Sequence, residues 1–273
     1  MIRKLKGWVK KHKKLKRVTL WLMQILAPVF QIVNVLAIPR YITFLSEWRQ
    51  FRKAGGVAKV LDFHPCLNDK SATTGIDTHY FHQAIWAFKQ IMASGAKRHV
   101  DVGSDIRFVG MLTVIADVTF IDIRPLEIKL AGFTSKSGSI VSLPIEDRSV
   151  PSLSSMHVIE HIGLGRYGDP IDPRGSLKAC NELKRVLTPD GRLYVSVPIG
   201  RSQVQFNGQR VFSVADVLAM FHGLNLVELS IVDTTGEFIE DVAVNDVTLK
   251  EGQGLDYGLG MFVFSAHRDH IRH

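Results

Sequence analysis

The chain has 273 residues, of which 46% are apolar, so it can bury a full hydrophobic core and is not a disordered tail. Its only two cysteines, Cys66 and Cys180, exclude a disulfide framework and any C-x-x-C motif, and a reducing compartment is expected. The formal net charge is +8, but nine basic side chains lie within residues 1–17 and the remaining residues carry 25 basic and 26 acidic groups, so no nucleic-acid partner is expected.

The basic N-terminus is followed by an uncharged apolar stretch, residues 18–39. This stretch is long enough to cross a bilayer, but two glutamines, a proline and an asparagine interrupt it. Three interpretations stay open: a signal anchor, a helix in the headgroup region with lysines against anionic lipid, and a soluble helix packed on the body. Since no small-residue cleavage site closes the stretch, a cleaved secretory signal is not expected. We expect residues 1–40 to bind or anchor the protein at an anionic membrane surface, with the body in the cytoplasm.

Two helices are expected before the main domain. Residues 41–56 alternate aromatic and basic side chains at helical spacing and end in two glycines, which predicts a short amphipathic helix. Residues 57–78 show no period and are expected to form an irregular connection. A second helix is predicted from about Thr78 to Ser94, and Gly95 is expected to end it.

From Lys97 onward, short β-branched runs alternate with helix-length segments, which is typical of βαβ units. The expected strands are His99–Val102, Val118–Asp122, Ser139–Val141, Leu153–Met156, Leu193–Val197, Leu226–Val232 and Met261–Phe264. Helices are expected after the first, second, fourth and fifth strands. The predicted fold is α/β: a Rossmann-like, seven-stranded, mostly parallel sheet with helices on both faces, preceded by an N-terminal basic and apolar helical segment.

Polar residues follow the first two expected strands. Ligands of open parallel sheets lie beyond the carboxyl ends of the strands, so these residues are candidates for a site. The first strand leads into Asp101-Val102-Gly103-Ser104-Asp105, where Gly103 lets the backbone approach a ligand and Asp101 can bind an amine or water. The second strand ends in Asp122, where an acid can accept hydrogen bonds from two ribose hydroxyls.

Together with the segments 143–147, 156–162 and 183–191, these strand ends resemble the class I S-adenosylmethionine-dependent methyltransferase superfamily. Within it, the segments 77–80, 101–104, 121–125, 157–169 and 257–258 look like the uncharacterised bacterial family catalogued as domain of unknown function 268. The resemblance implies S-adenosylmethionine as the cofactor and a role in surface-polysaccharide synthesis. The cofactor-binding residues that it implies are Asp101, Gly103, Ser104, Asp122, Ile123, Leu143 and His157.

The chain departs from the methyltransferase pattern in two places. Asp105 and Arg107 stand where the second and third glycines of the glycine loop would be. We expect Asp105 to place a carboxylate near the methionine end of the cofactor, and Arg107 to offset it by pairing with the cofactor's carboxylate. The acid that commonly contacts the adenine amine is also missing, since residues 139–142 contain none.

Two formal motifs do not fit their usual context. Residues 163–168 read G-x-G-x-x-G, but they precede Asp169-Pro170 instead of opening a helix, so they do not predict a dinucleotide site. Residues 157–161 read H-x-x-E-H, the inverted zinc-protease pattern, but they follow an expected strand instead of lying on a helix. No metal site is predicted.

The loop from Gly163 to Asp172 is crowded with polar side chains and is a candidate for substrate recognition. A loop simply tied by an Arg–Asp pair explains the same residues, and this alternative stays open. For methyl transfer to a hydroxyl, His161 or Asp169 is expected to act as general base, and Arg166 to hold an anionic sugar or phosphate.

The sequence thus predicts a membrane-associating segment over residues 1–40, a helix and connector over 41–78, and a methyltransferase-like domain over 79–273. The expected function is S-adenosylmethionine-dependent methyl transfer to a small-molecule or lipid-linked glycan at the cytoplasmic membrane surface. The alternative is a non-catalytic binding or scaffold protein that kept the fold. The oligomeric state is not predicted.

Overall fold

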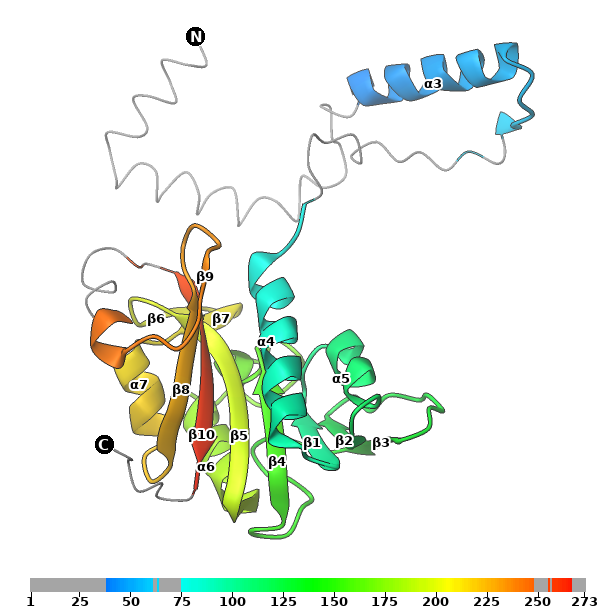
Figure 1. The fold of residues 1–273 in the computed structure, drawn as a ribbon. Coiled ribbons are helices and arrows are strands. Elements are labelled where there is room, and N and C mark those ends of the chain that lie inside the picture. The colour runs from blue at the N-terminus through cyan, green and yellow to red at the C-terminus, as the bar shows by residue number, and fades with distance from the viewer. Residues whose placement is uncertain (1–37, 61–62, 64–74, 248–254, 256, 267–273) are drawn as a thin grey trace, which may run out of the picture. The chain divides into compact units, whose positions relative to one another are not determined.

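The chain divides into two compact units, Met1–Gly75 and Ile76–His273 (Figure 1). The computed structural model describes residues 38–60, 63, 75–247, 255 and 257–266. Residues 1–37, which hold nearly all of the predicted membrane-associating segment, lie outside the described residues, as does much of the predicted connector. Among the described residues, no helix combines the length and the apolar character that a bilayer crossing requires.

In the first unit, the helix predicted over 41–56 is present as α3 (Ile38–Lys53). The chain then turns at Gly55, whose φ of 92° is in the left-handed region. The returning segment is held by Trp48, whose Nε1 donates to the Ala58 carbonyl at 3.1 Å, and by the edge-on contact of Phe63 with Phe44 at 5.1 Å between ring centroids. The described part of the first unit is thus a helix with a short segment folded back on its aromatic side.

The second unit is built on an eight-stranded sheet with the order β3-β2-β1-β4-β5-β10-β8-β9. The first five strands in this order run parallel, and β10 runs antiparallel to both of its neighbours. The strands are β1 (Arg98–Val102), β2 (Asp117–Asp122), β3 (Phe133–Ser137), β4 (Val150–Met156), β5 (Leu187–Ile199), β8 (Asn225–Val232), β9 (Phe238–Ile239) and β10 (Gly258–Ser265). A separate hairpin pairs β6 (Gln203–Gln205) with β7 (Gln209–Val211). The predicted mostly parallel Rossmann-like sheet is confirmed, with eight strands instead of seven.

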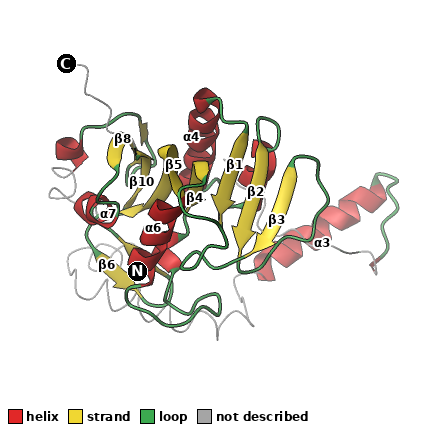
Figure 2. Cartoon of the chain, turned by 90° about the horizontal axis from the view of Figure 1, so that it is seen from below, coloured by secondary structure: helices red, strands yellow, loops and turns green. Residues whose placement is uncertain are grey.

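Helices cover both faces of this sheet, as predicted (Figure 2). One face packs against α4 (Thr78–Ser94) and α5 (Ile106–Leu112), and the other against α6 (Gly175–Val186) and α7 (Val214–Met220). Strand β10 shows why two cores form: Met261 and Val263 belong to the core under α4, whereas Phe262 and Phe264 belong to the core under α6. Successive side chains of a strand point to opposite faces, so a continuous apolar run fills both layers.

The helix predicted from Thr78 to Ser94 is confirmed as α4. The Asp77 carboxylate accepts the backbone N–H groups of His79 and Tyr80, and Gly95 ends the helix in the left-handed conformation with φ of 70°. These are the two ends that the sequence signals specify. The cap matters for the site, because the first turn of α4 lies against the end of β4.

Two predicted elements are wrong. The strand predicted over Ser139–Val141 is a turn closed by a bridge between Ser139 and Ser142, and the third strand is instead β3, six residues earlier. Close packing of Gly138 on Pro144, where an added Cβ would lie 2.7 Å from Cδ, bends the chain there. The early start of β3 leaves only residues 123–132 for a parallel crossover, too few for a helix with two turns. The helix predicted after the second strand is therefore absent.

Candidate functional site

The candidate site is a cleft at the carboxyl ends of β1, β2 and β4. It consists of two adjoining cavities of about 320 and 530 Å³. The first, here the apolar cavity, has Ile123, Ile140, Val141 and Val158 in its wall. The second, here the polar cavity, is lined by Tyr80, Ser104 and Asp105 among others. Both cavities share Gly103, Asp122, Arg124, His157, His161 and Tyr167.

Gly103 makes the sharp turn that opens the cleft after β1. Its φ is 75°, and a Cβ at this position would lie 3.1 Å from Cγ1 of Val158. The next residue ties the turn to β4, because Ser104 Oγ accepts the backbone N–H of Met156 at 2.9 Å. The backbone at Gly103 can therefore approach a ligand more closely than any residue with a side chain would allow.

Asp101 lies below this turn and lines neither cavity. Its carboxylate is fully buried and accepts the backbone N–H and the hydroxyl of Ser104, at 3.0 and 2.7 Å, and the hydroxyl of Ser154. Burial raises the pKa of Asp101 to about 6, although these hydrogen bonds oppose the rise. The structure thus places Asp101 as the residue that positions Ser104, one layer beneath the predicted ligand contact.

The network of buried, hydrogen-bonded side chains continues behind Asp101. His99 is 1% exposed, and its two ring nitrogens lie 2.8 Å from the hydroxyls of Ser152 and Ser154. Burial lowers the pKa of His99 to about 3, so the ring is neutral at physiological pH. Both ring nitrogens of His99 are therefore paired with hydroxyls while the imidazole stays uncharged.

The two residues that replace glycines bind one another. Asp105 caps α5, and its carboxylate accepts three hydrogen bonds from Arg107: from the backbone N–H at 2.8 Å, from Nε at 3.0 Å and from Nη2 at 2.6 Å. These hydrogen bonds hold the pKa of Asp105 below its ordinary value. The expected pairing of Arg107 with a cofactor is therefore replaced, in this structure, by pairing with Asp105 itself.

Asp122 ends β2 and faces both cavities. Its Oδ1 accepts the backbone N–H of Arg124 at 2.7 Å, while Oδ2 accepts no hydrogen bond from the described residues. The Arg124 guanidinium lies 3.9 Å away and stacks over the Tyr167 ring. One carboxylate oxygen is therefore left for a ligand, in the place where the sequence predicts a ribose contact.

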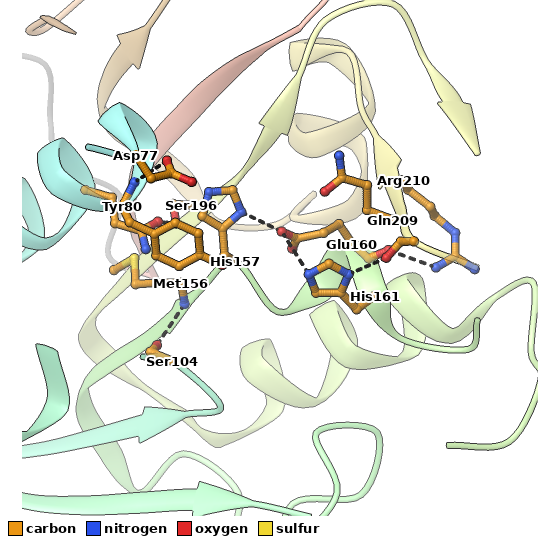
Figure 3. A network of polar contacts seen from close by, with 12 residues as sticks. Asp77, Tyr80, Ser104, Met156, His157, Glu160, His161, Ser196, Gln209 and Arg210 are labelled. Carbon is orange, nitrogen blue, oxygen red and sulfur yellow. Dashed lines mark hydrogen bonds and ion pairs between the residues drawn. The ribbon is translucent and has the colours of Figure 1, made fainter. Parts of the chain in front are cut away.

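The H-x-x-E-H segment forms a buried network around Glu160, a residue of η3 (Ile159–His161), as Figure 3 shows. The Glu160 side chain is fully buried; its Oε1 lies 2.6 Å from Nδ1 of His157 and 3.7 Å from Nε2 of His161. The other nitrogen of the His161 ring, Nδ1, donates to the Gly208 carbonyl at 2.7 Å. Nε2 of His157 and Oε2 of Glu160 are buried and have no hydrogen-bond partner in the described part of the chain. Among the described residues, no group of three or more side chains could hold a metal ion.

His157 adopts a left-handed backbone conformation, with φ of 55°, which is uncommon for a residue with a side chain. Its ring stacks on Tyr80 at 5.0 Å and runs nearly parallel to His79, which in turn stacks on Tyr257. Strained conformations persist where neighbouring structure holds them, often at functional sites. A row of flat side chains from the start of α4, the residue after β4 and the residue before β10 thus lies beside the polar cavity, which Tyr80 and His157 line.

The loop from Gly163 to Asp172 is a closed turn whose polar side chains hold its own backbone. Asp169 accepts the backbone N–H groups of Gly163, at 2.6 Å, and Tyr167, at 3.3 Å. Gly163 has φ of 80° and lies directly against the Asp172 carbonyl. These contacts explain the formal glycine motif, and they favour a positioning role for Asp169 over the predicted role of general base.

Of the remaining predicted site residues, some lie at the cleft and one does not. Arg166 donates to the Gly208 carbonyl at 3.0 Å and stacks on Tyr167. Ile123 lines the apolar cavity, whereas Leu143 is buried in the core and lines neither cavity.

Sequence reasoning missed Arg210, which is buried and donates to the Ile162 carbonyl at 2.6 Å and to Ser176 at 3.0 Å. A lone arginine in a hairpin carries no sequence signal for such a role.

Comparisons with known proteins agree with this architecture. A family model described as "Caenorhabditis protein of unknown function, DUF268" matches residues 147–251, so the predicted family is matched over part of the chain, although its description is not bacterial. The N-methyltransferase NodS from Bradyrhizobium japonicum, in complex with S-adenosyl-L-homocysteine, is 15% identical with a TM-score of 0.50, over 73% of this chain and 90% of that one. The [4+2]-cyclase SpnF is 12% identical with a TM-score of 0.50, over 72% and 85%. No curated protein matches the chain in sequence.

At such identities the likeness shows the fold alone. The second unit has the Rossmann-like fold of the class I S-adenosylmethionine-dependent methyltransferases. Because one of these two similar structures is a cyclase, the fold does not by itself define the reaction.

Proposed function

We propose that the protein binds S-adenosylmethionine in this cleft and transfers its methyl group to a small acceptor. The observation that carries the proposal is the pairing of Asp122, with its free Oδ2, and Gly103, whose backbone must stay bare, across one cleft. An acid at the end of the second strand and a glycine turn after the first are the two features that nucleotide-type ligands need in open parallel sheets.

The residues present fit this cofactor. Asp122 would accept hydrogen bonds from the ribose hydroxyls, and the walls formed by Ile123 and Val158 would cover an apolar ring. Gly103, Ser104 and His157 would line the path to the methionine end, with Asp101 holding Ser104 from below. Both cavities have volumes typical of small-ligand sites. When bound, the cofactor would supply a methyl group on a positively charged sulfur.

The chain's own residues would position the acceptor and accept its proton. His161 lines both cavities. Because its Nδ1 donates to the Gly208 carbonyl, Nε2 is the nitrogen left to accept a proton, and it lies 3.7 Å from Oε1 of Glu160. A proton taken by Nε2 would be stabilised by the buried Glu160 carboxylate. Asp169 and Arg166 would hold the loop that carries Tyr167 against the acceptor.

We further propose that the acceptor is a surface-glycan or glycolipid intermediate and that residues 1–40 hold the protein on an anionic membrane. Support comes from the cluster of nine basic residues in 1–17 followed by an uncharged apolar stretch. Family resemblance to proteins associated with polysaccharide synthesis points the same way.

Calorimetric titration of the full chain with S-adenosylmethionine and S-adenosylhomocysteine tests the proposal. We expect Asp122→Asn to weaken binding by about tenfold to a hundredfold, the range for hydrogen bonds to a charged group. The matched control is Asp117→Asn, an exposed carboxylate at the other end of the same strand, which should bind as the wild type does.

The same titration distinguishes the methyltransferase from the alternative, a non-catalytic scaffold protein. The mutual pairing of Asp105 and Arg107, which fills two glycine positions, favours a scaffold that no longer binds the cofactor. If the folded wild-type chain binds neither ligand at millimolar concentration, the methyltransferase proposal is wrong and the scaffold function stands.

A further inference from the structure

Exposed apolar side chains surround the mouth of the cleft. Among those that line its cavities are Tyr80 at 40% exposure, Ile106 at 54% and Ile123 at 44%. They come from different segments: the first turn of α4, the start of α5 and the residue after β2. Since all three segments lie at the carboxyl ends of the strands, their apolar side chains gather at one end of the second unit.

Two further segments next to the cleft also carry exposed apolar side chains. The β6–β7 hairpin carries Val204 and Phe206, which are 59% and 74% exposed, and the loop after η3 carries Ile171, 64% exposed. The hairpin is fixed to the cleft, because the Gly208 carbonyl accepts hydrogen bonds from both His161 and Arg166. We call Tyr80, Ile106, Ile123, Ile171, Val204 and Phe206 the apolar rim.

Guanidinium groups accompany the rim. Arg107 and Arg124 directly follow Ile106 and Ile123, and their side chains are 83% and 69% exposed. Each also faces a carboxylate, Asp105 or Asp122, so the pairs add little net charge. An apolar side chain next to an exposed guanidinium suits the boundary between lipid headgroups and acyl chains, where the apolar part is buried and the charged part stays hydrated.

The chain itself indicates which partner meets this surface. Its strongly basic part, residues 1–17, attracts anionic lipid and is followed by an uncharged apolar stretch. The first unit joins the second at Ile76, and two residues later α4 begins with the turn that places Tyr80 in the cleft. The chain therefore enters the second unit at the end that carries the cleft mouth.

We propose that the apolar rim inserts into the headgroup region of an anionic bilayer, so that an acceptor carried on a lipid reaches the cleft directly from the membrane. This inference rests on the proposed function for the acceptor, but the membrane contact of the rim does not depend on it. It also accounts for large apolar side chains that are left in water around a polar cleft, a pattern that marks interaction surfaces.

Fluorescence quenching in the full chain tests the proposal. Phe206→Trp places a reporter on the rim, and Val114→Trp places a matched reporter 82% exposed before β2, at the amino ends of the strands. Vesicles of phosphatidylcholine and phosphatidylserine with brominated acyl chains serve as the probe. We expect the added Phe206→Trp emission to shift to the blue and to be quenched at least twice as strongly as that of Val114→Trp.

Affinity provides the second readout. The double variant Val204→Ser/Phe206→Ser should bind the same vesicles about tenfold more weakly, whereas Val114→Ser should bind as the wild type does. Equal quenching of the two reporters would overturn the proposal. So would a Phe206→Trp signal already shielded without vesicles, because another part of the chain or a second copy would then cover the rim.

The outcomes separate this inference from the proposed function. Binding of S-adenosylhomocysteine, measured without vesicles, tests only the cleft, and quenching tests only the rim. A rim that contacts lipid on a protein that binds no cofactor would leave the inference standing and refute the methyltransferase function.

Discussion

At the scale of single residues, the site depends on a buried acid that does not face it. Asp101 holds Ser104, and Ser104 in turn holds the end of β4. A fully buried carboxylate is costly unless it is hydrogen-bonded, and here three donors from two serines supply those bonds. The turn that exposes the Gly103 backbone therefore has a pH-sensitive support.

We predict that Asp101→Asn changes how the stability of the protein depends on pH. The pKa of Asp101 is about 6 in the fold against an ordinary value of 3.8, so the folded state binds more protons than the unfolded state between about pH 4 and 6. The contribution of Asp101 to the free energy of unfolding therefore falls as pH rises through that window, by on the order of 3 kcal/mol in all. The stability of Asp101→Asn relative to wild type should rise by that order from pH 4 to pH 7, as measured by urea denaturation.

His99 changes the stability with pH in the opposite direction, so its effect must be separated from that of Asp101. Its pKa is lowered to about 3, so its contribution to stability is lost as pH falls below its ordinary value of 6.5. Because His99 titrates in both proteins, its contribution cancels in the difference between variant and wild type. A constant difference between pH 4 and pH 7 would contradict the prediction, and Asp117→Asn controls for the loss of one exposed carboxylate.

At the scale of elements, two side chains of α6 hold the connection between β3 and β4. The chain between β3 and β4 has no helix, and Arg185 holds it by donating to the carbonyls of Leu143, at 3.1 Å, and Ile145, at 2.9 Å. Glu182 accepts the Leu143 N–H at 2.7 Å and pairs with Arg185. Backbone groups that a crossover helix would satisfy are thus satisfied by two side chains.

We predict that Arg185→Gln loosens this connection without unfolding the sheet. Losing hydrogen bonds to two carbonyls and two carboxylates should cost about 1–3 kcal/mol, since the side chain is 29% exposed and water can replace part of them. Hydrogen exchange should quicken in residues 143–149 and stay unchanged in β5. Arg98→Gln, at the exposed start of β1, is the matched control. Equal exchange in both variants would show that Arg185 does not hold the connection between β3 and β4.

The same connection shows where sequence reasoning stops. Short β-branched and apolar runs and capping signals predicted α4, β1, β2 and β10, because local side-chain patterns determine those elements. The β-branched run at Ser139–Val141 misled because a turn held by tertiary packing on Pro144 overrides local strand preference. At the site, Asp122 and Gly103 were predictable from their strand-end positions. The stacking of Tyr80 on His157 and the role of Arg210 were not, since those partners are far apart in sequence.

At the scale of the whole molecule, charge and chemistry are separated along the chain. Residues 1–17 hold nine basic groups, whereas the rest is close to balanced. A concentrated positive charge acts at a distance of about one Debye length, roughly 8 Å at physiological salt. Under the proposed membrane association, such a segment would be attracted to an anionic surface.

We predict that salt controls membrane recruitment of the full chain. Each basic residue near an anionic leaflet contributes about 1 kcal/mol, so replacing the nine basic residues of 1–17 with glutamine should abolish binding to phosphatidylserine vesicles at physiological salt. Raising the salt to about 1 M, where screening acts within roughly 3 Å, should release the wild-type protein as well. Vesicle sedimentation measures both effects, and phosphatidylcholine vesicles are the control. Release by salt requires a segment that lies on the surface. Retention of the wild-type protein on vesicles at high salt would contradict this prediction, and the Val204→Ser/Phe206→Ser variant would then show whether the apolar rim or residues 18–39 hold it there.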